Sequence, residues 1–135
     1  MIKVFTDGGS RNNPGPAGIG IVIQDLTGTV LETKNEYIGE KTNNEAEYLA
    51  LIQGLKLALK YGKKALVFLD SELVVRQLNG QYKVKNAGLK PLFDEVQVLK
   101  MGFTNLSFKH IIREKNRLAD KLVNEAINRE LSKNN

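Results

Sequence analysis

Apolar and polar residues along the first forty positions follow patterns that predict three strands. Residues 2–7 (IKVFTD) are rich in strand-forming residues. Residues 17–25 (AGIGIVIQD) and 29–38 (TVLETKNEYI) form two further runs of this kind, and residues 26–28 (LTG) between them are typical of a hairpin turn. We therefore expect three consecutive antiparallel strands at the start of the chain.

The spacing of apolar residues becomes helical after this point. Residues 42–62 (TNNEAEYLALIQGLKLALKYG) predict the clearest helix, with Gly62 at its C-terminal end. The short apolar run 64–70 (KALVFLD) is typical of a strand buried on both faces. The remaining segments predict one or two helices in 71–80 and 89–102, a strand in 105–113, a last helix in 116–131, and a frayed tail in 132–135.

This order of elements predicts an α/β fold with a mixed sheet covered by helices. The length of 135 residues indicates one domain, residues 1–135, which buries roughly two-thirds of its unfolded surface. The hydrophobic fraction of 41% and the charged fraction of 26% are ordinary for a folded globule and argue against disorder.

Composition also indicates the cellular location of the protein and the class of molecule that it binds. No apolar run approaches the ~20 residues of a membrane span, and no signal-peptide pattern follows Met1. The absence of cysteine excludes disulfides and thiolate metal sites and agrees with a cytoplasmic protein. Lys and Arg total 20 against 15 Asp and Glu, and the resulting charge of +5 favours nucleic acid over a membrane as partner. A solvated lysine surface is the alternative.

Two aspartates follow strands that are apolar almost up to the acid. Asp7 ends the first predicted strand, and Asp70 ends the run 64–70. If these strands lie side by side in parallel, both acids emerge at the carboxyl edge of the sheet, where ligands bind in open α/β sheets. The alternatives are a turn residue for Asp7 and a helix cap for Asp70, although Ser71 can itself serve as the cap.

The predicted helix 42–62 begins with two glutamates in different settings. Thr42 and Glu45 have the spacing of a capping box, which gives Glu45 a structural role. Glu47 instead heads a stripe of small and apolar residues at helical spacing, and we expect it to face the sheet. The members of this stripe are Ala50, Leu51, Gly54, Leu55 and Ala58. The alternative for Glu47 is an exposed first-turn acid favoured by the helix dipole.

Asp120 is the fourth acid with a candidate role. It shares a helical stripe with Val123 and Ile127, at the margin of the buried face of the last helix, and a solvated charge at the rim is the alternative. Four acids near one sheet edge would repel one another and raise one another's pKa values unless cations lay among them. Oxygen ligands of this kind select Mg²⁺ or Mn²⁺. Two such ions about 4 Å apart would activate water and stabilise the leaving oxygen in phosphodiester cleavage.

The segments that carry these acids resemble, in chain order, the motifs of type 1 ribonuclease H in its compact archaeal-like form. They are TDGGSRNNPGPAG, TNNEAEYLALIQGL, FLDSELVVRQLNG and REKNRLADKLVNEA, and the similarity spans nearly the whole chain. The resemblance implies the ribonuclease H-like fold, a five-stranded mixed sheet with flanking helices. It also implies metal-dependent hydrolysis of the RNA strand in RNA–DNA hybrids, which leaves 3′-hydroxyl and 5′-phosphate ends.

The same resemblance assigns roles to individual residues. The catalytic and metal-binding acids become Asp7, Glu47, Asp70 and Asp120, with two Mg²⁺ ions, or Mn²⁺ as a substitute, bound together with substrate. The implied substrate-binding residues are Gly8, Asn13, Thr42, Asn43, Asn44 and Ser71.

Elementary chemistry agrees with part of this assignment. Side-chain amides such as those of Asn13 and Asn44 can bond base edges and sugars in a minor groove, and backbone N–H groups near Thr42 favour phosphate. Glu47 would be placed to accept a bond from a ribose 2′-hydroxyl. Turn and cap duty is the alternative for the two asparagines.

The chain departs from many bacterial members before the last acid. The segment HIIREKNRLAD is shorter than their glycine- and histidine-rich loop. A gapless count puts His110 at the place of the family histidine, but alternation with Leu106 and Phe108 indicates a strand residue instead. Arg113 or Lys115 is then expected to take over a charge role.

Two further departures concern substrate contacts. Glu72 stands where many relatives carry glutamine. The long basic insertion of some relatives is absent, although Tyr82, Lys83 and Lys85 could form a modest phosphate-binding patch or be ordinary solvated residues. Some members of the compact group also cut double-stranded RNA. We expect a monomer, and the competing hypotheses are a non-catalytic module that binds hybrids or double-stranded RNA and a related nuclease that acts on DNA.

Overall fold

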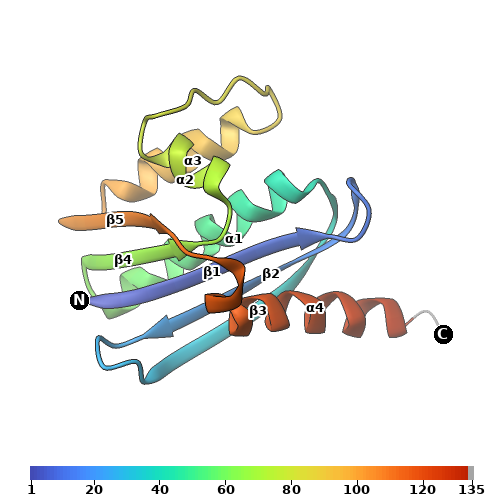
Figure 1. The fold of residues 1–135 in the computed structure, drawn as a ribbon, viewed down its shortest axis with the longest axis horizontal. Helices are drawn as coiled ribbons and strands as arrows, with labels where there is room; N and C mark the ends of the chain where they lie inside the picture. Colours follow the sequence, from blue (N-terminus) through green and yellow to red (C-terminus); the bar gives the residue numbers. More distant parts are fainter. Residues whose placement is uncertain (134–135) are drawn as a thin grey trace.

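The computed structural model describes residues 1–133, which form a five-stranded sheet with helices on both faces (Figure 1). The strand order is β3-β2-β1-β4-β5. The strands are β1 (Ile2–Ser10), β2 (Gly15–Gln24), β3 (Val30–Lys41), β4 (Lys64–Leu69) and β5 (Asn105–His110). β1, β2 and β3 pair in antiparallel fashion, whereas β4 is parallel to β1 and β5 is parallel to β4. The predicted mixed sheet is confirmed.

Helices cover the two faces unequally. They are α1 (Asn43–Ala58), η1 (Leu59–Tyr61), α2 (Glu72–Leu78), α3 (Lys90–Lys100), η2 (Arg113–Lys115) and α4 (Arg117–Ser132). In the view of Figure 1, α4 crosses in front of the sheet at β2 and β3, and α1 lies behind it against β1 and β2. α3 packs against α1, so the larger core lies on the α1 side.

Alternation along β2 explains why two helices pack so closely on it. Ile19, Ile21 and Ile23 are fully buried in the core on the α1 side. Gly18 and Gly20, on the opposite face of the strand, face α4, and a methyl group at Gly20 would overlap the backbone carbonyl of Ala119. The missing side chain therefore lets the first turn of α4 lie directly on the sheet.

The end of β1 corrects one prediction. Asp7 does not end its strand, because β1 continues through Gly8 and Gly9 to Ser10 and stays paired with β2 along this length. The turn comes only at residues 11–14. The two glycines therefore lie within the strand rather than at a reversal of the chain, and at Gly8 the absence of a side chain allows close packing.

Smaller differences concern helix ends. The first long helix stops at Ala58 and continues as the short 3-10 helix η1 before Gly62, whose φ of 133° suits glycine. α4 includes Ser132, which was expected to fray, and Asn134 and Asn135 lie outside the described residues. In the described part of the chain, none of the helices has the length and apolar content needed to cross a membrane.

Candidate functional site

The parallel pairing of β1 and β4 brings two predicted acids to the same level of the sheet. Phe5 pairs with Phe68 in the ladder, and their rings stack with centroids 4.9 Å apart. Two residues further along, Asp7 lies within β1, just past the end of its pairing with β4, and Asp70 directly follows β4. The side-by-side arrangement predicted for the two strands is therefore confirmed.

Glu47 reaches the same point from the first turns of α1. Its Oε1 atom accepts a hydrogen bond from the backbone N–H of Gly8 at 3.1 Å. A methyl group at Gly8 would overlap the carbonyl of Ala46, so glycine is needed where α1 meets β1. Thr42 and Glu45 form the predicted capping box at the start of the helix. The two glutamates thus have the different surroundings that their positions in the sequence indicate.

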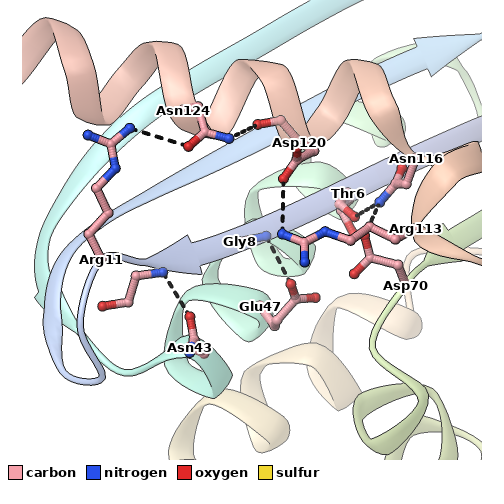
Figure 2. A network of polar contacts seen from close by, with 11 residues as sticks. Thr6, Gly8, Arg11, Asn43, Glu47, Asp70, Arg113, Asn116, Asp120 and Asn124 are labelled. Atoms are coloured by element: carbon pink, nitrogen blue, oxygen red, sulfur yellow. Dashed lines mark hydrogen bonds and ion pairs between the residues drawn. The ribbon is translucent and has the colours of Figure 1, made fainter.

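The three acids from β1, α1 and the end of β4 form a tight cluster. Asp7, Glu47 and Asp70 each offer a carboxylate oxygen within 4.8 Å of the others. Asp120 approaches the same pocket from α4 (Figure 2) and pairs with Arg113, whose Nη2 lies 3.6 Å from Oδ1. The structure therefore brings all four predicted acids to one pocket, with Asp120 bound to an arginine at its rim.

Burial and nearby negative charges raise the pKa values of two of these acids, Asp7 and Glu47. Asp7 and Glu47 are each only 7% exposed. Burial, together with the charges of Asp70 and Asp120, raises the pKa of Asp7 to about 7. Burial, followed by the charge of Asp7, also raises the pKa of Glu47 well above its usual range. Three crowded carboxylates, two of them with a raised pKa, form a donor set that suits a cation with a preference for oxygen.

The acids line a cavity of about 510 Å³ that opens to solvent. Polar groups surround them: Gly8, Asn43, Asn44, Ser71, Arg11, Arg113 and Asn124. The predicted substrate-binding residues Gly8, Asn43, Asn44 and Ser71 are therefore at the pocket. Ser71 also caps α2, because its Oγ accepts a bond from the N–H of Val74 at 3.3 Å.

Asn13 and Asn43 join the β1–β2 loop to the start of α1. The Oδ1 atom of Asn13 accepts a bond from the N–H of Asn43 at 3.0 Å, and Oδ1 of Asn43 accepts one from the N–H of Ser10 at 2.9 Å. The cap role that the sequence left open for Asn13 is thus present. Its amide nitrogen makes no hydrogen bond within residues 1–133.

A second polar cavity, of about 400 Å³, lies beside the first at the N-terminus of α1. Asn44 borders both cavities, and Asn13 and Thr42 line the second together with Asn86 and Gly88. Asn86 was not anticipated from the sequence. Its Oδ1 accepts bonds from the N–H groups of Gly88 and Leu89 and shapes the loop before α3.

The two candidate auxiliary residues, His110 and Arg113, lie at different places in the structure. His110 is the exposed last residue of β5 and lines a surface hollow with Glu72 and Arg76, outside the acidic pocket. Glu72 is bonded to Arg76 at 2.8 Å. Arg113, in contrast, lines the pocket itself. The interpretation of His110 as a strand residue is confirmed.

Asn116 is a site residue that the sequence reasoning missed. It is 2% exposed, and its Nδ2 atom donates to the carbonyl of Thr6 at 3.0 Å and to Oδ2 of Asp70 at 3.2 Å. A buried amide thus holds the Asp70 carboxylate in place. An asparagine at the predicted start of the last helix was the available signal, but it indicates only a cap.

Comparison with protein families and curated proteins gives consistent matches. Residues 5–126 match a family model described as reverse transcriptase-like. The chain is 37% identical over 127 residues to ribonuclease HI of Halobacterium salinarum, covering 93% of the chain and 64% of the relative. It is 31% identical over 147 aligned residues to ribonuclease H of Pseudomonas entomophila, with 93% of each covered.

Some curated relatives are much longer than this chain. A bifunctional protein of Mycobacterium tuberculosis is 43% identical over 128 residues. The match covers 93% of this chain and 35% of that relative. The chain therefore spans about a third of the length of such relatives.

Solved structures match the fold closely. LC11-RNase H1, solved in complex with an RNA/DNA hybrid, superposes with a TM-score of 0.93 at 50% identity, covering 97% of this chain and 99% of that one. RNase H1 of Halobacterium salinarum superposes with a TM-score of 0.91 at 37% identity, covering 94% and 97%.

Proposed function

The chain belongs to the ribonuclease H family, and from this premise we propose that it is a metal-dependent endonuclease acting on RNA–DNA hybrids. It would hydrolyse the RNA strand to 3′-hydroxyl and 5′-phosphate ends. The observation that carries the proposal is the cluster of Asp7, Glu47 and Asp70 at the floor of an open polar cavity. The similar LC11-RNase H1 was solved with an RNA/DNA hybrid, which supports this substrate class.

The residues of the pocket fit a divalent cation. Three carboxylates converge there, and Glu47 Oε2 is buried without a hydrogen-bond partner in the described residues. Hard oxygen donors of this kind suit Mg²⁺, with Mn²⁺ as substitute. Asp7, Glu47, Asp70 and Asp120 would hold the metal, which supplies activation of water and stabilisation of the leaving oxygen.

The protein's own groups would orient the acids and the strand. The Gly8 N–H fixes one oxygen of Glu47, and the Asn116 amide fixes one oxygen of Asp70. Asn44 lies between the two cavities, where an amide can reach base edges or sugars of a bound duplex. The second cavity, at the N-terminus of α1, would take a backbone phosphate.

Arg113 would supply a mobile positive charge at the pocket. Its side chain is 78% exposed, and it reaches Asp120 at 3.6 Å. An exposed ion pair of this kind is weak and can open. The arginine can therefore move to a phosphate of substrate or product, a role that His110 cannot fill from its place outside the pocket.

The test is a cleavage panel with Asp7→Asn. Wild type should cut the RNA strand of a hybrid in Mg²⁺ or Mn²⁺, whereas the variant should lose nearly all cleavage and keep its fold and hybrid binding. Glu36→Gln is the matched control, because Glu36 is an exposed acid on β3, outside the pocket, and its loss should leave turnover unchanged.

The outcomes separate the competing hypotheses. Wild-type turnover in Asp7→Asn would remove the proposed mechanism. Hybrid binding by the wild type without metal-stimulated cutting would favour a binding module, and cleavage of duplex DNA alone would favour a DNA-directed nuclease. Duplex RNA belongs in the same panel, because its cleavage is an expectation from the compact form. Monomeric state and cytoplasmic location stay predictions.

A further inference from the structure

A second arginine, Arg11, lines the acidic cavity from the β1–β2 loop. Arg113 is engaged with Asp120, but Arg11 has no carboxylate within ion-pair distance among residues 1–133. Its guanidinium instead donates to Oδ1 of Asn124 at 3.3 Å (Figure 2). A full positive charge thus stands at the edge of a pocket of acids without being neutralised by any of them.

The bond partner of Arg11 is held in a fixed orientation. Nδ2 of Asn124 donates to the backbone carbonyl of Asp120 at 3.0 Å, one turn earlier on α4. This bond determines which end of the amide is nitrogen, so the oxygen faces Arg11. Because a guanidinium has five N–H donors and one is used here, most of its bonding capacity remains.

We infer that Arg11, positioned by Asn124, binds a backbone phosphate of the strand that enters the acidic pocket. This inference rests on the proposed function and adds a subsite to it. A guanidinium matches phosphate in both charge and bidentate geometry, whereas the neutral amide that holds it is a weaker partner. Asn124 lies four residues after Asp120, about 6 Å along the helix axis. The bound phosphate is therefore one or two nucleotides from the one that is cut.

A purely electrostatic role inside the protein is the competing explanation. In that case Arg11 would only offset repulsion among the carboxylates. Its removal would then change the dependence of cleavage on metal concentration and leave the salt dependence of binding untouched. A phosphate contact predicts the reverse, because each phosphate neutralised by the protein adds to the salt sensitivity.

The experiment compares Arg11→Gln with Arg129→Gln. Arg129 is a matched control, because its guanidinium also donates to an asparagine Oδ1, that of Asn35, at 3.3 Å, but it lies outside the pocket. Hybrid binding is measured by fluorescence anisotropy in Ca²⁺ across a salt series. Arg11→Gln should weaken binding about tenfold and lower the slope of log K against log salt by about 0.9. Arg129→Gln should change neither.

A second measurement locates the contact. The hybrid is made with one neutral methylphosphonate linkage at a time near the cleavage position of the RNA strand. In the wild type, a neutral linkage at the contacted phosphate should raise KM about tenfold. In Arg11→Gln the same linkage should have no further effect, and kcat with Mg²⁺ should stay within about threefold.

Failure of this inference is distinct from failure of the proposed function. A wild-type protein that cleaves hybrid, together with an Arg11→Gln variant of unchanged salt slope, overturns only the subsite. A neutral-linkage penalty that persists in the variant does the same, as does a shifted metal dependence with unchanged binding. A wild-type protein that neither binds nor cuts hybrid overturns both.

Discussion

Asn116 connects the last helix to the carboxylate of Asp70. Its Nδ2 atom makes a buried bond to the Thr6 carbonyl and a partly buried one to Asp70. Asn116→Ala leaves both acceptors without this donor, and leaving the buried Thr6 carbonyl without it costs about 1–3 kcal/mol. We expect the variant to lose about 2 kcal/mol of unfolding free energy and to cleave more slowly, as measured by urea denaturation and by kcat on hybrid.

Asn79 provides a control for the effect of the Asn116–Asp70 bond on catalysis. Asn79 also donates from Nδ2 to a backbone carbonyl, that of Phe108, at 3.3 Å, but it touches no acid of the pocket. Asn79→Ala should cost about 1 kcal/mol or less and leave kcat unchanged. Equal kcat losses in the two variants would show that Asn116 has no special role in holding Asp70.

Residue-level reasoning from the sequence worked where local spacing decides the environment. Glu45 and Glu47 are two positions apart, and their helical phases alone separated a cap from an inward-facing acid. Asn116 and Arg11 could not be assigned in this way. Their partners, Asp70 and Asn124, lie 46 and 113 positions away in the chain, and only the fold brings them together.

At the level of elements, the approach of α1 to β1 depends on one glycine. A methyl group at Gly8 would overlap the Ala46 carbonyl, whereas one at Gly9 would meet Val123 Cγ1 at an ordinary 3.6 Å. Gly8→Ala must therefore push α1 away from the sheet, at a cost of about 3 kcal/mol. Gly9→Ala should stay within about 1 kcal/mol of wild type. Thermal unfolding of the pair tests this, and similar melting temperatures would contradict the packing argument.

The same glycines show why one strand end was predicted wrongly. A Gly-Gly pair after an aspartate is a common turn signal, and the sequence gives no sign of a helix packed above it. In the structure the pair stays in the ladder with β2, opposite Ile19 and Gly18. A glycine in a sequence can mark either a turn or the close approach of another element. At Gly8 the approaching element is α1, which lies 35 or more residues away in the chain.

For the whole molecule, strand direction is what made the acidic site predictable. Two apolar segments that each lead into an aspartate indicated a shared edge as soon as they were taken as parallel neighbours. The structure confirms that pairing through β1 and β4. The rim of the pocket was less predictable, because loop and helix side chains such as Arg11 and Asn124 are placed by the sum of all packing contacts.

The free energy of unfolding should depend on pH because ionisation of the buried acids in the pocket is unfavourable. Without metal, burial raises the pKa of Asp7 from 3.8 to about 7, and that of Glu47 rises as well. The unfolded chain releases the Asp7 proton near pH 4, but the folded protein keeps it until near pH 7. Unfolding in this interval therefore releases protons, and the folded state loses stability as the pH rises from 4 to 7.

Asp7→Asn cannot ionise at this position, so the variant should lack the decrease in stability between pH 4 and 7 and can test its origin. In EDTA at pH 8 the variant should be more stable than wild type, by at most on the order of 4 kcal/mol at about 1.4 kcal/mol per pKa unit, and the difference should shrink toward pH 4. Mg²⁺ should reverse the order, because it stabilises the ionised cluster of the wild type more. Calorimetry at four pH values, with EDTA and with Mg²⁺, measures both effects. A stability difference that is independent of pH would mean that Asp7 ionises in the folded protein as it does in the unfolded chain.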